Sequence, residues 1–206
     1  MSSPPRGLIW FCGKTQVKKT THAVALAHEV KDATGDPILV IDSQGAWNFR
    51  EWPRAQDRRG LYEAVYGRRQ DCAMTPADEN DVEAVYRTVR QLGRCTVLLD
   101  EASFWISKRK LPTDISRALR AWAHCGVLFL FTTQRIGDIH PTALAIDCEI
   151  RVYQTLTGPD SDRLWDDYRI KLEEVQRLPV GSYITIRNGE VQRGGDGCPR
   201  VTVEAA

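Results

Sequence analysis

The chain contains 206 residues, of which 42% are hydrophobic, and its formal net charge at pH 7 is +1. A charge so close to zero excludes a general polycation, so any nucleic-acid contact must come from local basic clusters. No apolar run approaches the ~20 residues of a membrane-spanning helix, and we expect no signal peptide. Six scattered cysteines without a C-x-x-C pair argue against a zinc site and fit a reducing cytoplasm.

Apolar runs alternate with helical patterns along the chain, which indicates an α/β fold with a central, mostly parallel sheet flanked by helices. We expect a single domain over residues 1–206, with a core at about 7–190 and a C-terminal tail at about 194–206. The predicted strands are 7–12, 38–42, 95–101, 127–134 and 148–155.

Apolar residues at helical spacing predict helices between these strands. In the helix that carries the apolar positions of 82–92, we expect Thr75 to be the N-cap and Pro76 the first helical residue. Near the C-terminus, SYITIRNGEVQR alternates with period two around Asn188-Gly189, which predicts a β-hairpin with a type I′ turn. The other predicted helices are 19–31, 61–67, 113–124 and 141–146.

The segment GKTQVKKT, residues 13–20, follows the first strand and nearly matches the phosphate-loop pattern G-x-x-x-x-G-K-[ST]. Lys18 stands where the pattern has its second glycine. At a strand-to-helix turn, backbone N–H groups and the helix dipole favour phosphate. Lys19 would then reach the β- and γ-phosphates, and the Thr20 hydroxyl would ligate Mg²⁺. Taken alone, the loop fits a basic helix N-terminus without a ligand equally well.

The segment TVLLDE is an apolar strand that ends in two adjacent carboxylates, Asp100 and Glu101. Ligands of open α/β sheets bind beyond the carboxyl ends of the strands, so these acids and the loop are expected at one edge. We expect Asp100 to hold Mg²⁺, directly or through water, and Glu101 to orient or deprotonate the attacking water. A solvated acidic turn is the alternative.

A third polar element, TTQR, follows the next strand at residues 132–135. Gln134 is suited to hydrogen-bond both a water and a γ-phosphate oxygen, so it would report the state of the nucleotide. An ordinary polar strand end is the alternative for this residue. The three elements together, each at a strand end and in this order, favour a nucleoside triphosphatase.

The order GKTQVKKT, LLDE, FTTQR and LPVGSYITIRNGE resembles the FtsK/HerA superfamily of P-loop ATPases over about residues 7–190. The small size resembles its viral branch, the genome-packaging ATPases of tailless icosahedral viruses, many with an internal membrane. The resemblance implies a RecA-like sheet with strand order 5-1-4-3-2, and a ring, commonly a hexamer, around double-stranded DNA. ATP and Mg²⁺ are the implied cofactors.

The motif correspondence implies roles for individual residues. Thr20 and Asp100 would bind Mg²⁺, Glu101 would be the catalytic carboxylate and Gln134 the sensor. With Lys18 in place of glycine, either the loop shifts and Lys18 joins the phosphate site, or nucleotide affinity is weakened. The residues expected to bind nucleotide are Gly13, Lys14, Thr15, Gln16, Val17, Lys18, Lys19, Thr20 and Thr21.

Ring ATPases usually borrow an arginine from the neighbouring subunit. Arg120 is the preferred candidate, followed by Arg117, with Arg135 as the third; a solvated helix face is the alternative for each. The basic segment 107–110, with Lys108, Arg109 and Lys110, would track DNA phosphates without reading bases. The other candidate DNA surface is the set of arginines at 54, 58, 59, 68 and 69, and a merely solubilising surface is the alternative to both.

The leading functional hypothesis is an ATP-driven double-stranded DNA translocase that packages a viral genome into a preformed capsid. Its expected partners are DNA, identical subunits, a capsid vertex or portal-like protein and the viral internal membrane. We expect it in the host cytoplasm or at the packaging vertex of the virion. The alternatives are another FtsK/HerA-type motor, for phage morphogenesis, extrusion or DNA transfer, and a nucleotide-binding vertex protein that hydrolyses weakly. The LLDE pair argues against a small-molecule kinase.

Overall fold

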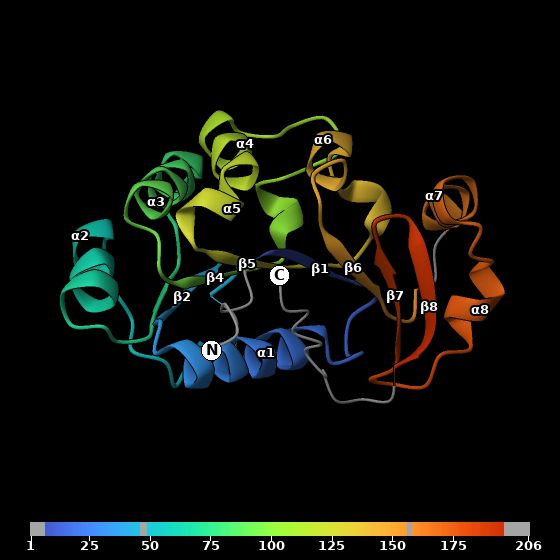
Figure 1. The fold of residues 1–206 in the computed structure, drawn as a ribbon, viewed down its shortest axis with the longest axis horizontal. Helices are drawn as coiled ribbons and strands as arrows, with labels where there is room; N and C mark the ends of the chain where they lie inside the picture. Colours follow the sequence, from blue (N-terminus) through green and yellow to red (C-terminus); the bar gives the residue numbers. More distant parts are fainter. Residues whose placement is uncertain (1–6, 46–48, 156–157, 196–206) are drawn as a thin grey trace.

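The computed structural model describes residues 7–45, 49–155 and 158–195, whose strands form one eight-stranded sheet (Figure 1). From edge to edge, the strand order is β3-β2-β4-β5-β1-β6-β7-β8. The strands are β1 (Gly7–Cys12), β2 (Ile38–Asp42), β3 (Cys72–Met74), β4 (Thr96–Asp100), β5 (Leu128–Thr133), β6 (Glu149–Val152), β7 (Tyr183–Arg187) and β8 (Glu190–Gly195).

The sheet is parallel from β3 to β6 and antiparallel at its C-terminal end, where β7 pairs with β6 and β8 with β7. The five predicted strands are β1, β2, β4, β5 and β6. Their spatial order, β6-β1-β5-β4-β2, is the expected order 5-1-4-3-2. The mostly parallel sheet and the C-terminal hairpin are therefore confirmed. Asn188 and Gly189 have φ values of 51° and 78°, and a type I′ turn requires positive φ at both.

Helix α1 covers one face of the sheet and α3 to α6 cover the other, while α7 and α8 lie beside the hairpin end (Figure 1). Two three-residue 3₁₀ turns, Ala102–Phe104 and Ile136–Asp138, follow β4 and β5. The helices are α1 (Lys19–Thr34), α2 (Arg58–Tyr62, continued by a π turn at Glu63–Gly67), α3 (Glu79–Leu92), α4 (Thr113–Arg120), α5 (Trp122–Cys125), α6 (Pro141–Leu144), α7 (Gly158–Tyr168) and α8 (Leu172–Gln176).

The predicted start of the third helix is wrong. Helix α3 is capped by Asp78, whose side chain accepts a hydrogen bond from the Asp81 N–H at 3.0 Å. The Thr75 hydroxyl instead accepts from the Arg54 side chain, 3.0 Å away. Both residues are good N-caps by type, and a tertiary contact that the local sequence does not reveal decides between them.

Other departures from the predicted elements concern short or interrupted segments. The helix expected at 113–124 is divided at Ala121 into α4 and α5. Strand β3 and helices α7 and α8 were not predicted, because three to eleven residues with little periodicity give a weak signal. Strand β8 reaches Gly195, beyond the expected end of the core near 190, and residues 196–206 of the expected tail lie outside the described residues.

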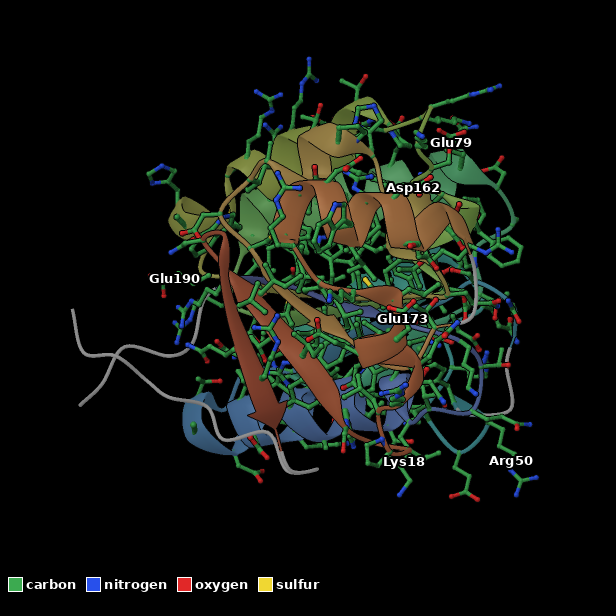
Figure 2. The ribbon with its side chains drawn as sticks, turned by 90° about the vertical axis from the view of Figure 1, so that its right-hand side faces the viewer. Lys18, Arg50, Glu79, Asp162, Glu173 and Glu190 are labelled. Atoms are coloured by element: carbon green, nitrogen blue, oxygen red, sulfur yellow. The ribbon has the colours of Figure 1, made fainter. Side chains whose placement is uncertain are left out.

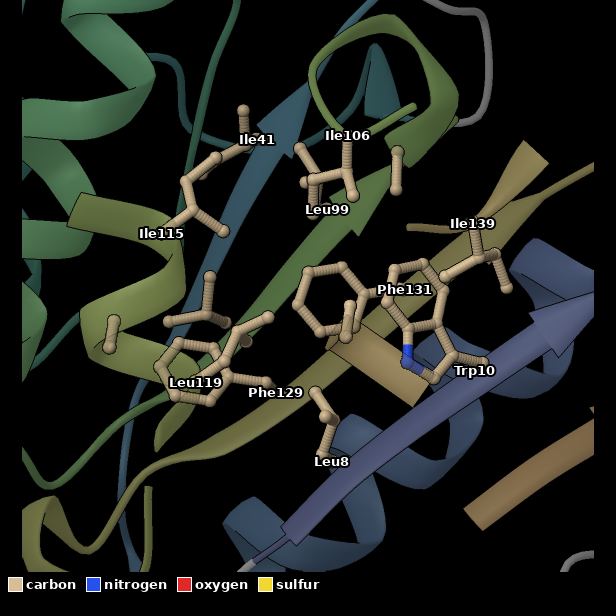
Figure 3. Close-up of a cluster of buried hydrophobic side chains, with 14 of the residues drawn as sticks. Leu8, Trp10, Ile41, Leu99, Ile106, Ile115, Leu119, Phe129, Phe131 and Ile139 are labelled. Carbon is tan, nitrogen blue, oxygen red and sulfur yellow. The ribbon is translucent and has the colours of Figure 1, made fainter. Parts of the chain in front are cut away.

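Two apolar layers hold the helices to the sheet. On the side of α3 and α4, Trp10 stacks on Phe131 with ring centroids 4.4 Å apart (Figure 3). Tyr86 of α3 stacks on Phe129 at 5.5 Å, which ties this helix to β5. On the other side, Leu26 and other apolar residues of α1 pack against Val40, Leu98 and Leu130. The central strands are buried on both faces, as their unbroken apolar sequences predict.

Parallel pairing brings the carboxyl ends of β1, β2, β4 and β5 to one edge of the sheet. Cys12, Asp42, Asp100 and Thr133 end these strands. Asp42 and Asp100 are direct register partners, so two acids from distant parts of the sequence meet side by side. Within the described residues, no helix is long and apolar enough to cross a membrane.

Candidate nucleotide-binding site

The loop between β1 and α1 is pressed against the end of β6. A Cβ built on Gly13 would lie 2.7 Å from Cβ of Tyr153 and 3.0 Å from the Gln154 carbonyl oxygen, so only glycine fits there. The Lys14 N–H donates to the same Gln154 oxygen at 2.9 Å. This close approach explains why the loop retains its first glycine.

Lys18 adopts the backbone conformation that glycine normally supplies at this position. Its φ and ψ are 67° and 19°, in the left-handed region, and it is the N-cap of α1. A lysine there costs more than glycine because its Cβ crowds the backbone. The side chain is exposed and points outward from the body of the protein (Figure 2). A Cβ on Gly181 would lie 3.6 Å from the Lys18 Cδ, so the lysine stem runs beside that loop.

The neighbouring lysine behaves differently. Lys19 is 5% exposed, and its ammonium donates to the Lys14 carbonyl oxygen at 2.7 Å, across the mouth of the loop. Burial lowers the pKa of Lys19, while the nearby carboxylates of Glu101 and Asp100 oppose that shift. The sequence assigned the phosphate-contacting role to Lys19, and its side chain lies inside the loop beside both acids.

Asp100 links the loop to two strands of the sheet. Its Oδ1 accepts hydrogen bonds from Thr20 Oγ1 at 2.9 Å and from Thr132 Oγ1 at 2.7 Å. Asp100 is 3% exposed, and burial raises its pKa, while the two threonine hydroxyls act in the opposite direction. The contact between Thr20 and Asp100 spans 80 residues of sequence and joins the two motifs that the sequence placed at one edge.

Glu101 occupies a strained position at the end of β4. Its φ and ψ are 50° and 59°, in the left-handed region that non-glycine residues rarely adopt. Its N–H donates to Thr132 Oγ1 at 2.9 Å. Burial raises the pKa of the Glu101 carboxyl, whereas Lys19 and a hydrogen bond from the Gln134 side chain lower it. Its Oε2 is buried and has no hydrogen-bond partner among the described residues.

The oxygen atoms of Thr20 and Asp100 suit a site for a nucleotide with Mg²⁺. Magnesium ions in such sites are usually held by one or two protein oxygens together with phosphates and waters. The Thr20 hydroxyl and the Asp100 carboxylate supply hard oxygen ligands beside the buried Lys19 cation. The unpartnered Oε2 of Glu101 is an acceptor ready for a water molecule.

Sequence reasoning missed a second layer of polar residues behind Asp100. Asp42 is fully buried and accepts from Arg54 Nη2 at 2.6 Å. The Ser43 hydroxyl donates to the Asp100 carbonyl oxygen at 2.5 Å, and Trp105 Nε1 donates to Ser43 Oγ at 2.8 Å. The sequence ILVID does carry a signal for Asp42, since it ends in an acid as TVLLD does.

The three candidate arginines lie in different surroundings. Arg117 is 3.5 Å from Asp114 of its own helix. Among the described residues, the exposed side chains of Arg120 and Arg135 have no ion-pair partner. Arg135 follows β5 at the carboxyl edge. Arg120 ends α4, and the chain then enters β5 at the amino end of that strand. Arg120 therefore lies toward the amino edge of the sheet, whereas Gln134 lies at the carboxyl edge. The fold therefore does not bring Arg120 or Arg117 to the loop of the same subunit.

The basic segment forms a tight turn. Ser107 and Lys110 exchange two backbone hydrogen bonds, of 2.8 and 3.0 Å, which leaves Lys108 and Arg109 at the exposed tip. Lys110 forms an ion pair with Glu79 of α3. Within the part of the chain that the structure describes, Lys108 and Arg109 have no such partner.

Replacing Lys18 by glycine tests whether the left-handed backbone at this position is strained. We expect Lys18→Gly to raise the free energy of unfolding by roughly 0.5–1 kcal/mol, since relief of the left-handed strain exceeds the added freedom of the unfolded chain. Chemical denaturation measures this gain, and Lys18→Ala, which retains the strain, is the control. Mg²⁺-ATP binding should survive Lys18→Gly and be abolished by Lys19→Ala. A severe loss in Lys18→Ala with a mild effect in Lys19→Ala would show that the motif register is wrong.

The raised pKa of Glu101 predicts a stability gain from its amide. Because the folded protein binds the Glu101 proton more tightly than the unfolded chain, stability falls as pH rises between the two pKa values, and the loss persists above both. Glu101→Gln should therefore raise Tm at pH 7–8, and the gain should vanish near pH 4. Thermal unfolding across pH measures this, with the exposed Glu29→Gln as control. An equal Tm change at both pH values would exclude the ionisation as its cause.

Comparisons with known proteins give the fold a context. No protein-family model matches the chain, and no curated protein matches its sequence. Among solved structures, the genome packaging NTPase B204 from Sulfolobus turreted icosahedral virus 2, in complex with sulfate, is 18% identical with a TM-score of 0.72. The match covers 91% of this chain and 95% of that one.

Two further structures have related folds. B204, the DNA-packaging ATPase from Sulfolobus Turreted Icosahedral Virus, is 16% identical over 92% of this chain and 97% of its own, with a TM-score of 0.69. The Thermomonospora curvata ATPase EccC, in complex with a signal sequence peptide, is 9% identical over 88% of this chain and 35% of its own, with a TM-score of 0.57. The chain thus has the P-loop NTPase fold of viral genome-packaging NTPases, over nearly its full length.

Proposed function

We propose that this protein is an ATPase that drives double-stranded DNA into a viral capsid. The observation that carries the ATPase part is the 2.9 Å hydrogen bond between Thr20 and Asp100, which sets the Lys19 loop against the Asp100–Glu101 pair. The structural neighbours add support, because the genome packaging NTPase B204 has been solved in complex with AMP, ATP-gammaS and AMPPCP.

The residues of the site divide the work of hydrolysis. Lys19 and the N–H groups of the loop bind the phosphates. Thr20 and Asp100 would hold Mg²⁺, which would supply positive charge against the phosphates. Glu101 takes a proton from the attacking water, and its raised pKa moves it toward the working pH of a general base. Gln134, hydrogen-bonded to Glu101, senses the occupied site and helps to orient the water.

The basic turn at 107–110 is the proposed contact with DNA phosphates. Its exposed cations, Lys108 and Arg109, follow β4 by a few residues. Trp105, just before the turn, reaches the Asp100 backbone through Ser43, by hydrogen bonds of 2.8 and 2.5 Å. Movement of this turn on binding DNA would therefore be transmitted to the end of β4, which carries Asp100.

The alternative basic surface has fewer uncommitted cations. Arg54, Arg58 and Arg69 form ion pairs with Asp42, Asp81 and Asp36, respectively. Among the described residues, only Arg59 and Arg68 of that set have no ion-pair partner. A cation that already pairs with a carboxylate contributes less to a phosphate contact, so this observation favours the turn.

A ring of identical subunits completes the proposal, with a hexamer as the expected size and a capsid vertex or portal-like protein as its docking partner. Arg120 is uncommitted and lies toward the edge opposite its own phosphate loop. An arginine so placed serves a neighbouring subunit better than its own. Another motor of the FtsK/HerA type would share this site, and a weakly hydrolysing vertex protein would share only the nucleotide binding.

ATP hydrolysis with and without double-stranded DNA tests the central proposal. We expect DNA to stimulate turnover, and Glu101→Gln to reduce it by ~10²-fold or more while Mg²⁺-ATP still binds. Combined Lys108→Ala and Arg109→Ala should abolish the stimulation, leave basal hydrolysis intact and reduce the salt slope of DNA binding by about 2. Arg59→Ala with Arg68→Ala removes equal charge as the control. Loss of stimulation in that control alone would move the DNA contact to the second surface.

Mixing of mutant subunits tests the ring. Subunits with Arg120→Ala and subunits with Glu101→Gln should each be slow alone, because a trans arginine is worth ~10³-fold or more in rate. Their mixture should regain activity at junctions that pair a normal arginine with a normal glutamate. Activity per subunit should also rise with protein concentration. Concentration-independent hydrolysis without rescue would indicate a self-sufficient monomer, and rescue with Arg135→Ala instead would reassign the arginine.

A further inference from the structure

We propose that Thr132 is a positioning residue that holds both acids of the site in register. This inference rests on the proposed ATPase function and adds a residue that the sequence motifs left without a role. One hydroxyl serves both carboxylate residues: Thr132 Oγ1 accepts from the Glu101 N–H at 2.9 Å and donates to Asp100 Oδ1 at 2.7 Å.

The hydroxyl is committed to these two partners by its surroundings. Thr132 is fully buried, so no bulk water competes for its lone pairs or its proton. The Asp100 carboxylate can only accept from it and the Glu101 N–H can only donate to it. The direction of both hydrogen bonds is therefore fixed.

The Glu101 backbone needs this support. Its φ of 50° places a non-glycine residue in the left-handed region, which turns the chain sharply out of β4 and aims the carboxylate at the site. A strained conformation persists only where its surroundings determine it. The hydrogen bond from the Glu101 N–H to Thr132 is the side-chain contact that anchors this turn to β5.

Thr132 also has a role that Thr20 does not duplicate. Both hydroxyls donate to Asp100 Oδ1, but Thr20 lies in the first turn of α1, directly after the loop, and is the proposed metal ligand. Thr132 belongs to the central strand β5, which pairs with both β1 and β4. It therefore fixes Asp100 to the sheet whether or not nucleotide occupies the loop.

The next residue provides a matched control. Thr133 lies on the same strand and is 1% exposed, but alternation along the strand turns its side chain toward the opposite face. Its hydroxyl has a long contact of 3.5 Å to the Arg135 carbonyl oxygen and none with either acid among the described residues. Thr133→Val therefore makes the same chemical change, loss of a buried threonine hydroxyl, at a residue that has no hydrogen bond to Asp100 or Glu101.

Kinetics of the valine and serine variants test the proposal. Thr132→Val keeps the shape and leaves the Glu101 N–H without its partner, so kcat should fall by about 10- to 100-fold while KM changes less than about threefold. Thr132→Ser keeps the hydroxyl and should stay within about threefold of the wild type, as should Thr133→Val. Equal loss in the serine and valine variants would show that packing matters and the hydroxyl does not, which would overturn the proposal.

A double-mutant cycle and hydrogen exchange separate this idea from the ATPase proposal. If Thr132 acts through Glu101, adding Thr132→Val to Glu101→Gln should cost little further rate, whereas independent effects would multiply. Without nucleotide, amide exchange in the segment that contains Glu101 should speed up in Thr132→Val and not in Thr133→Val. Unchanged exchange would refute the anchoring role. This readout holds even if the wild-type protein hydrolyses no ATP, which would overturn only the proposed function.

Discussion

The hydrogen bonds that meet at Asp100 Oδ1 determine the geometry of the whole candidate site. They join the first turn of α1, through Thr20, to the end of β5, through Thr132. Because Asp100 itself ends β4, one carboxylate oxygen connects three elements that are far apart in sequence. The parallel order of the central strands makes this possible, since it brings their carboxyl ends to one edge.

Burial of charged groups at the carboxyl edge of the sheet lowers the stability of the fold, but it suits the proposed catalysis of ATP hydrolysis. Two carboxyls have raised pKa values and a lysine has a lowered one, each mainly because burial disfavours its charged form. Attraction between Lys19 and the two carboxylates opposes these pKa shifts without removing them, whereas the charge of Asp100 adds to the shift of Glu101. The left-handed backbone of Glu101 adds strain at the same place. Buried charge and backbone strain of this kind are typical of functional sites. The well-packed aromatic core around Trp10 and Phe131 offsets the stability that they cost.

The unusual loop illustrates how a sequence deviation is absorbed. Lys18 keeps the backbone path of a glycine by adopting the left-handed region itself, and its side chain leaves toward solvent beside Gly181. The loop therefore keeps Lys19 buried at its mouth and Thr20 in contact with Asp100. The missing glycine therefore strains the backbone at Lys18 but does not change the path of the chain.

The sequence by itself determined the fold class, the positions of the five central strands and the loop and acid motifs at their ends, because unbroken apolar strands and motif spacing are local signals. The resemblance of these motifs to a known superfamily implied the strand order. Only the tertiary structure decided which capping residue begins α3 and where Lys18 points. It also decided that Asp42, Ser43 and Thr132 lie against Asp100, with Trp105 hydrogen-bonded to Ser43. The physical reason is that a hydrogen bond or a strand register between distant residues depends on how the elements pack, and no periodicity along the chain encodes it.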